Sequence, residues 1–222
     1  MKDFNLKRRL FSEWIGTALL VAVVIGSGIM GENLADGNDA IALLANTLAT
    51  GAALVVLILI FGQISGAHFN PVVSLSLALQ GGLRWREFFF YTLVQILGGL
   101  AGTVLAHSMF DLPLIQISTH VRTGAGIWIG EIIASCGLLM TIIGVHKNHP
   151  QAVPYAVGLF ITAGYWFTSS TSFANPAVTM ARAFSDTFAG IRPGDIGGFI
   201  MAQILGAAGA TFLMRWLYKP NI

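Results

Sequence analysis

Cysteine and charge are both scarce in this sequence, and each shortage excludes a class of protein. Cys136 is the only cysteine, so a fold stabilised by disulfides within the chain is excluded. Only 10% of the residues are charged, with a formal net charge of +2, whereas about a quarter of an ordinary soluble domain is charged. A long basic tract is also lacking, which argues against nucleic acid as a partner. The chain is therefore predicted to be a membrane protein whose surroundings are the lipid bilayer.

The residue groups that enzymes use are lacking as well. The sequence has no recognisable nucleophile with a base and an orienting group, no phosphate-binding loop and no cluster of metal ligands. Its five histidines are dispersed along the chain. We therefore predict no catalytic activity, no cofactor and no bound metal.

Long apolar runs are what the sequence has in quantity. Six of them approach the ~20 residues that a helix needs to cross the hydrocarbon core, at 10–30, 40–62, 85–107, 126–145, 152–167 and 196–217. The fifth is short and is expected to extend by a few residues at either end. The first carries Glu13 and lacks an obvious cleavage site, so we interpret it as a retained span rather than a signal peptide. Two further apolar stretches, after Pro71 and after Pro176, are typical of half-helices that enter and leave on one side.

The chain also repeats itself. The segment QILGGLAGT at 95–103 returns as QILGAAGAT at 203–211, and Asn-Pro occurs at Asn70 and again at Asn175. Each half therefore has the order span, span, half-helix, span. The two repeats cover about 10–108 and 124–217. Three crossings place the second half upside down relative to the first, as in many channels and transporters. The prediction is a single all-α membrane domain over 1–222, with six transmembrane helices and two re-entrant half-helices in an inverted repeat.

The distribution of cations predicts the orientation, because the cytoplasmic ends of membrane proteins collect Lys and Arg. With the amino terminus inside, three cations fall outside, at Arg122, Arg182 and Arg192. The cytoplasmic side then holds nine, which are Lys2, Lys7, Arg8, Arg9, Arg84, Arg86, Lys147, Arg215 and Lys219. Both termini are therefore predicted to be cytoplasmic, with the Asn70 half-helix entering from inside and the Asn175 half-helix from outside.

Asn-Pro suits the start of a helix. Proline lacks the N–H that the first turn cannot use, and asparagine is a strong N-cap. One copy would most simply be a structural cap, but two copies in an inverted repeat bring two positive helix ends together near the bilayer centre. There, water or a hydroxyl would donate away from both asparagine amides, and a cation would meet an electrostatic barrier. The pair therefore predicts a pore for neutral molecules.

SGAHFNPVVS at 65–74 and SFANPAVTMAR at 172–182 resemble the paired Asn-Pro-Ala boxes of the aquaporin and aquaglyceroporin family. The resemblance covers nearly the whole chain and implies an aquaporin-like fold that assembles as a homotetramer with one pore per subunit. It implies that the boxes are Asn70, Pro71, Val72, Asn175, Pro176 and Ala177, and that the pore-lining loop backbone comes from Gly66, Ala67, His68 and Ser172. Val72 departs from the family alanine, a small loss of space that leaves both asparagine amides intact.

Glu13 and Glu131 stand at corresponding points of the repeat, where the family also has glutamate. Carboxylates within a membrane are costly and therefore have a functional or structural reason. We interpret both as struts that accept hydrogen bonds from the loop backbone behind each box. The alternative is a proton relay, which would make the chain a proton-coupled secondary transporter.

The resemblance also implies a selectivity filter made by Thr50, Ala163, Phe173 and Val178. A water-selective pore resembling this one has Phe, His, a small residue and Arg at these places. Val178 lies about 4.5 Å beyond Asn175 along the half-helix, so the missing arginine leaves a wider and more apolar constriction. Arg182, one turn further, is expected to line the outer vestibule or to pair with Asp186, with a return of its side chain into the pore as the alternative.

A wide pore with few donors admits larger neutral solutes. Valine in this place, with threonine and alanine at the other positions, resembles the branch of bacterial aquaglyceroporins associated with arsenic. This resemblance implies passage of arsenite and related metalloid hydroxides, together with glycerol or water, across a bacterial inner membrane. The alternatives are an ordinary glycerol or water facilitator and, in a different class, the proton-coupled transporter.

Overall fold

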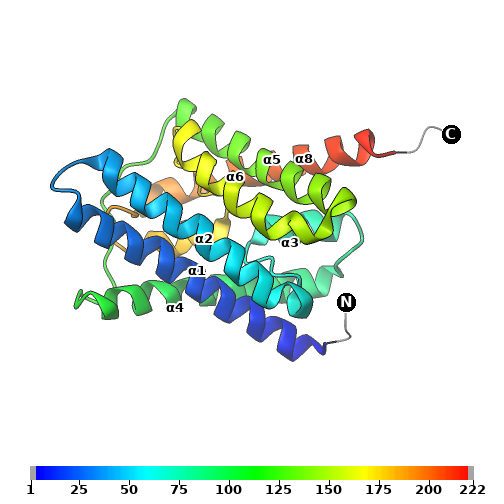
Figure 1. The fold of residues 1–222 in the computed structure, drawn as a ribbon, viewed down its shortest axis with the longest axis horizontal. Coiled ribbons are helices and arrows are strands. Elements are labelled where there is room, and N and C mark those ends of the chain that lie inside the picture. The colour runs from blue at the N-terminus through cyan, green and yellow to red at the C-terminus, as the bar shows by residue number, and fades with distance from the viewer. Residues whose placement is uncertain (1–3, 220–222) are drawn as a thin grey trace.

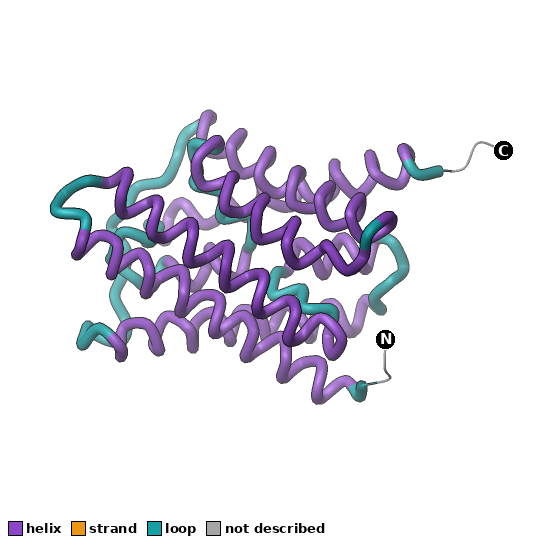
Figure 2. Tube along the Cα trace, in the orientation of Figure 1, coloured by secondary structure: helices purple, strands orange, loops and turns teal. Residues whose placement is uncertain are grey.

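The structure is a computed structural model that describes residues 4–219, and every regular element among them is a helix (Figure 2). The elements are α1 (Leu6–Leu34), α2 (Asp39–Ser65), α3 (Pro71–Leu79), α4 (Trp85–Met109), α5 (Ala125–Asn148), η1 (Pro150–Ala152), α6 (Val153–Phe167), α7 (Pro176–Arg182), η2 (Pro193–Asp195) and α8 (Ile196–Leu217). This order confirms the predicted all-α fold with a short helix after each Asn-Pro site. Lys2, one of the cations counted on the predicted cytoplasmic side, lies outside the described residues.

The longer helices lie roughly along one axis, which is horizontal in Figure 1. Five of them, α1, α2, α4, α5 and α8, are long and apolar enough to cross a membrane. The sixth, α6, has 15 residues, which is about 22 Å of helix. Its expected extension is found at the start, where the single 3-10 turn η1 precedes it. At the other end the helix stops because Thr168 adopts extended backbone.

The two halves of the chain pack in the same way. In the first half α1 packs on α2 and α4, and in the second half α5 packs on α6 and α8. A glycine allows α1 and α4, and likewise α5 and α8, to approach closely. A side chain at Gly98 of α4 would collide with the backbone of Trp14 in α1, and a side chain at Gly206 of α8 would collide with the backbone of Ile132 in α5. Small residues at such crossings give the close packing on which helix association in lipid depends.

The short helices α3 and α7 each pack against both α4 and α8. Each begins with the Asn-Pro pair that predicted it. The side chain of Asn70 accepts from Val72 N at 3.0 Å, and that of Asn175 accepts from Ala177 N at 3.0 Å. With nine and seven residues, neither helix is long enough to cross a bilayer.

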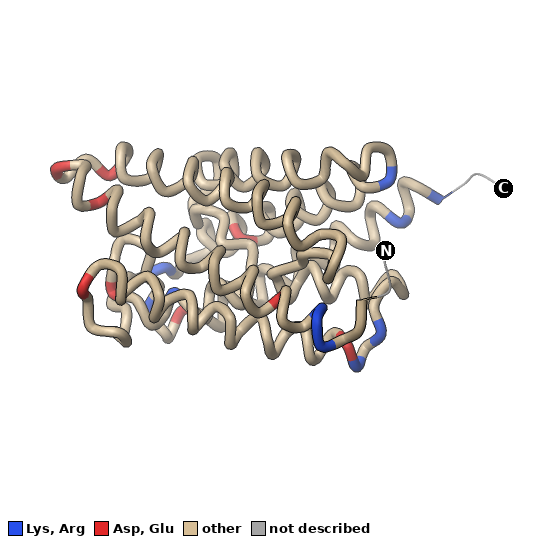
Figure 3. Tube along the Cα trace, turned by 60° about the horizontal axis from the view of Figure 1, so that its bottom comes forward, with Lys and Arg blue, Asp and Glu red and all other residues tan. Residues whose placement is uncertain are grey.

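Charge and apolar surface are segregated along the molecule. Figure 3 shows most Lys and Arg at the end where both termini lie, and most Asp and Glu toward the opposite end. Between the ends, the helices expose large apolar side chains such as Leu59, Leu93, Leu159 and Leu205. An apolar band between charged ends is the surface that a membrane-spanning protein needs.

Candidate functional site

Each half-helix is reached through a loop of unusual backbone. In the first loop Ala67 and Phe69 both have φ of 48°, and in the second Thr171, Ser172 and Ala174 have φ of 60°, 51° and 46°. Residues other than glycine rarely adopt this left-handed region, and such strain persists only where the surroundings fix it. The positions match across the repeat, since both loops have a left-handed residue one and three places before the capping asparagine.

Glu13 holds the first loop in this shape. Its carboxylate is fully buried and accepts backbone N–H bonds from His68 at 3.0 Å and from Phe69 at 2.7 Å. The side-chain amide of Gln95 donates to the same carboxylate at 2.8 Å. Three donors therefore surround one buried carboxylate, which offsets the cost of taking it out of water.

Glu131 does the same for the second loop. It is fully buried and accepts backbone N–H bonds from Phe173 at 2.8 Å and from Ala174 at 2.9 Å. The amide of Gln203 donates to it at 2.6 Å. The two halves thus use the same residue types for the same contacts, in the arrangement of a support behind each loop.

The direction of these N–H bonds sets the direction of the loop carbonyls. In a trans peptide the C=O points opposite to the N–H of the next residue. The carbonyls of Ala67 and His68 therefore point away from the first carboxylate, and those of Ser172 and Phe173 point away from the second. All four residues line one cavity. The two loops therefore lie on the cavity wall with these four carbonyls turned away from the buried glutamates.

The two capping asparagines lie together. The Nδ2 of Asn70 donates to the carbonyl of Ala174 at 2.7 Å, and the Nδ2 of Asn175 donates to the carbonyl of Phe69 at 2.8 Å. Each amide carries a second N–H, and both asparagines line the cavity. The starts of the two half-helices are therefore joined by reciprocal hydrogen bonds, with one N–H of each cap left for the cavity.

The cavity has a volume of about 1490 Å³. At the end near the termini its lining includes Arg9, Lys147 and Arg215, and past the two boxes it reaches Val178 and Arg182. Most of the wall between these ends is apolar. It is therefore a lumen that runs beside the asparagine pair, with polar groups concentrated at the boxes and at the end near the termini.

Of the four predicted filter residues, Thr50, Phe173 and Val178 line the lumen. The prediction for Ala163 is wrong, because this residue is exposed and is not among the lining residues. A step of two residues turns a helical side chain by about 200°. Tyr165, two positions later, lines the lumen instead, and its hydroxyl donates to Thr50 Oγ1 at 3.3 Å.

Arg182 is buried and lines the lumen. Its Nε donates to the carbonyl of Ala189, and its Cζ lies 3.4 Å from the centre of the Phe173 ring. The predicted pairing with Asp186 is wrong, because Asp186 accepts instead from the N and Oγ1 of Thr119 at 2.8 Å and 3.0 Å. Those hydrogen bonds lower the pKa of Asp186. The arginine side chain therefore returns toward the lumen rather than toward the carboxylate of Asp186.

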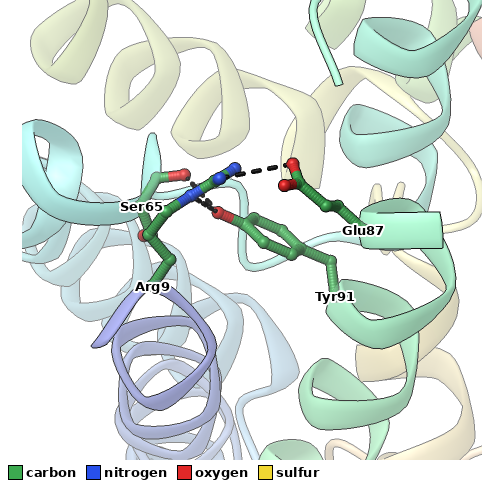
Figure 4. A network of polar contacts seen from close by, with 4 residues as sticks. All are labelled: Arg9, Ser65, Glu87 and Tyr91. Carbon is green, nitrogen blue, oxygen red and sulfur yellow. Dashed lines mark hydrogen bonds and ion pairs between the residues drawn. The ribbon is translucent and has the colours of Figure 1, made fainter. Parts of the chain in front are cut away.

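At the end near the termini, a polar network joins three helices (Figure 4). The Tyr91 hydroxyl donates to the carbonyl of Ser65, the last residue of α2, at 2.9 Å. Arg9 donates from Nε to the Tyr91 hydroxyl at 2.9 Å and pairs with Glu87 at 3.2 Å. The His68 ring lies 5.2 Å from the Tyr91 ring. The network thus fixes the point where the first loop leaves α2.

Comparison with known proteins agrees with this geometry. The family described as Major intrinsic protein matches residues 1–152. Aquaglyceroporin AqpS of Rhizobium meliloti is 56% identical over 220 residues, which cover 99% of this chain and 94% of that protein. The chain belongs to the major intrinsic protein family. Membership of this family confirms the predicted resemblance to aquaporins and aquaglyceroporins.

The chain is also similar, at lower identity, to two further proteins. The glycerol uptake facilitator protein of Streptococcus pneumoniae is 26% identical over 190 residues, covering 78% of this chain and 80% of that protein. The X-ray structure of the aquaglyceroporin from Plasmodium falciparum superposes with a TM-score of 0.78 at 20% identity, covering 96% of this chain and 98% of that one. The fold is therefore shared over nearly the full length.

Three features of the site were missed from the sequence. Tyr165 could have been predicted as a lumen residue, because it places a hydroxyl group within an apolar run. The Arg9–Tyr91 contact joins residues from different spans, for which spacing gives no signal. Arg122 comes from the loop before α5, yet its Cζ lies 5.2 Å from the centre of the Phe173 ring. Such contacts depend on how loops fold over the bundle.

Proposed function

We propose that the chain is a passive channel for small neutral solutes, with arsenite and related metalloid hydroxides among them and glycerol and water as companions. The observation that carries the proposal is a lumen lined both by the two capping asparagines and by the loop residues whose carbonyls point away from the buried glutamates. Donors and acceptors along one path suit solutes that carry hydroxyl groups.

A hydroxylated solute finds both kinds of partner in this lumen. Its hydroxyls donate to the loop carbonyls on either side of the boxes, and its oxygens accept from Asn70 and Asn175. These bonds replace part of the hydration that the solute loses. A cation is opposed at the same place, because each half-helix start carries about half an elementary charge. Selection for neutral molecules follows from this arrangement.

Metalloid hydroxides are the finer part of the proposal. Val178 places an aliphatic side chain on the lumen wall where a filter arginine would take up space and supply donors. Thr50 and Tyr165 add hydroxyls to the same wall. An uncharged tri-hydroxyl solute needs more room than water and several hydrogen-bonding partners, and this wall supplies both.

The test is uptake into proteoliposomes that contain the purified chain. We expect arsenite at neutral pH, where it is undissociated, to enter faster than into empty liposomes, and glycerol to enter rapidly as well. Rapid glycerol entry with arsenite entry no faster than in empty liposomes would reject the metalloid part. That outcome would favour the second candidate, an ordinary glycerol facilitator, to which the likeness to the Streptococcus pneumoniae protein gives support.

A proton-coupled transporter is disfavoured by the contacts of the two buried glutamates. Each carboxylate already accepts two backbone N–H bonds and one amide bond. Neither glutamate is among the lumen-lining residues of the described chain. A proton relay needs a carboxylate within reach of the transported proton, so these groups suit a support better than a relay.

The assembly and the orientation belong to the same proposal. We infer a homotetramer in a bacterial inner membrane, with both termini cytoplasmic. The inference is supported by the apolar outer surface and by the cations gathered at the end that holds both termini. Crosslinking in native membranes, and protease access to tags at each terminus, would test the two parts separately.

A further inference from the structure

Arg182 is a buried cation that lacks an anionic partner. The residue is 2% exposed, and its Nε donates to the carbonyl of Ala189. The ion pairs among residues 4–219 are Arg9 with Glu87 and Arg192 with Asp195, so no carboxylate neutralises it at close range. Burying an unpaired charge is expensive. Such a charge calls for a reason beyond the stability of the fold.

The guanidinium has a fixed platform on the lumen wall. Its Cζ lies 3.4 Å from the centre of the Phe173 ring, a stacking distance that adds cation–π attraction. Phe173 is itself held by Phe199, with ring centres 4.9 Å apart. Arg182 and Phe173 both line the lumen, one helical turn beyond Val178 and just before the box respectively. The charge is therefore held in one place rather than on a mobile side chain.

The terminal nitrogens of Arg182 have no partner in the described part of the protein. Among the hydrogen bonds of residues 4–219, only its Nε donates to a protein acceptor. Polar groups in protein interiors are normally satisfied, and Arg182 lines the lumen. The free N–H groups of the guanidinium therefore indicate a place where a passing solute binds.

We propose that Arg182, stacked on Phe173, is the charge-selecting element of the outer constriction, and that its free N–H groups form the outermost binding position for neutral solutes. This inference rests on the proposed channel function. The guanidinium repels cations and donates to solute oxygens. Because the guanidinium lies against the Phe173 ring, it supplies a positive charge without filling the space that an arginine in place of Val178 would occupy.

The experiment compares urea with guanidinium, which have the same planar shape and differ in charge. Guanidinium stays protonated far above neutral pH. Entry of each into proteoliposomes gives a permeability ratio that is independent of pore width. The native chain is expected to pass urea and to exclude guanidinium. Arg182→Gln is expected to raise guanidinium entry by about tenfold, the scale expected for removing one charge from a partly desolvated site, with urea entry little changed.

Arg122→Gln is the matched control. Arg122 also carries one charge beside the Phe173 ring, at 5.2 Å, but it donates to the carbonyls of Gly190 and Phe188 and is not part of the lumen lining in residues 4–219. Its loss is expected to leave guanidinium excluded. In Arg182→Gln, adding Val178→Arg is expected to restore exclusion and to slow urea.

A second variant, Arg182→Lys, keeps a positive charge that a rise in pH can remove. Desolvation lowers the pKa of a buried lysine, so Arg182→Lys is expected to exclude guanidinium at pH 7 and to admit it at pH 10. The charged or titratable neighbours are Arg122, Tyr165 and Glu131, and the native chain at both pH values controls for them. This variant decides the question if Arg182→Gln does not fold.

Three results would overturn the inference: guanidinium entry in the native chain at the rate of urea, unchanged exclusion in Arg182→Gln, or equal leaks in the Arg182 and Arg122 variants. In Arg182→Lys, exclusion that does not change with pH would overturn it as well. If the native chain passed neither urea nor glycerol, the channel function itself would fail, and this result is separate from any change in the ratio.

Discussion

Seven residues after its capping asparagine, the first half-helix carries Leu77 and the second carries Arg182, and both side chains line the lumen. Three residues after the cap the two halves agree, with Val73 and Val178, which also line it. The halves are therefore alike around the boxes and differ one turn further along. The difference separates the repeated part, which builds the wall around the boxes, from the part that is not repeated, where we propose that selection among solutes takes place.

The repeated part extends through the supports. Both loops have a buried glutamate that accepts two backbone N–H bonds, a glutamine on that carboxylate and a cap that reaches the other loop. In the part that is not repeated, His68 lies near Tyr91 whereas Phe173 lies against Arg182. Substitutions at corresponding positions of the two halves can therefore distinguish residues that support the fold from residues that select among solutes.

The largest effects are expected at the supports. Glu13→Ala and Glu131→Ala each leave two buried loop N–H groups without partners, at about 1–3 kcal/mol each, so the free energy of unfolding should fall by about 2–6 kcal/mol. Thermal unfolding in detergent and urea flux in proteoliposomes measure the loss, with Glu→Gln as the milder control. A large effect of one glutamate substitution and none of the other would contradict the claim that the two halves use the same support.

The filter comes next. Val178→Arg brings a long cation into the lumen, and we expect glycerol and urea entry to fall about tenfold, which corresponds to about 1.4 kcal/mol of added barrier. Stopped-flow light scattering on proteoliposomes measures the rates. Val178→Leu, which adds bulk without charge, should change them far less. Unchanged rates in the arginine variant would mean that the constriction lies elsewhere.

The caps should have smaller and equal effects. Asn70→Ala and Asn175→Ala each remove an N-cap, at about 1 kcal/mol, and one inter-loop hydrogen bond, at about 1 kcal/mol. Thermal unfolding of both single variants is expected to give the same loss within error. Asn→Ser keeps a capping oxygen but not the reaching amide, and should recover about half. Clearly unequal losses would show that the two boxes do not support each other symmetrically.

The smallest effect is expected at the position where matching to the family failed. Ala163→Leu adds apolar surface to an exposed site, so its effect on stability should stay within about 0.5 kcal/mol and solute flux should not change. Thr50→Leu, which fills the lumen and removes the contact with Tyr165, should slow urea. If Ala163→Leu slowed urea as much, α6 would have to be rotated relative to the structure.

Much of the fold could be predicted from the sequence because its signals are strong and local. Apolar runs of spanning length gave the long helices, and Asn-Pro gave the starts of α3 and α7 because proline and asparagine act within one turn. The short run 152–167 was the weakest of these signals, and the ungapped match there put Ala163 on the wrong face. A match of letters along an apolar helix does not fix its rotation.

The site was most predictable in its repeated part. Glu13 and Glu131 were recognisable because intramembrane carboxylates are rare and these two recur in register. The stack of Arg182 on Phe173 was not predictable, because it depends on the loop that brings the carbonyl of Ala189 to the guanidinium. By charge, Asp186 was the expected partner of Arg182, but its carboxylate accepts hydrogen bonds from Thr119 instead.

The central claim is that neutral solutes cross passively beside two opposed asparagine caps. The most direct test is the initial rate of glycerol entry into proteoliposomes as a function of glycerol concentration, measured with and without an imposed pH gradient. A passive lumen predicts a linear rate that is the same in both conditions. A rate that saturates and requires the gradient would contradict the account.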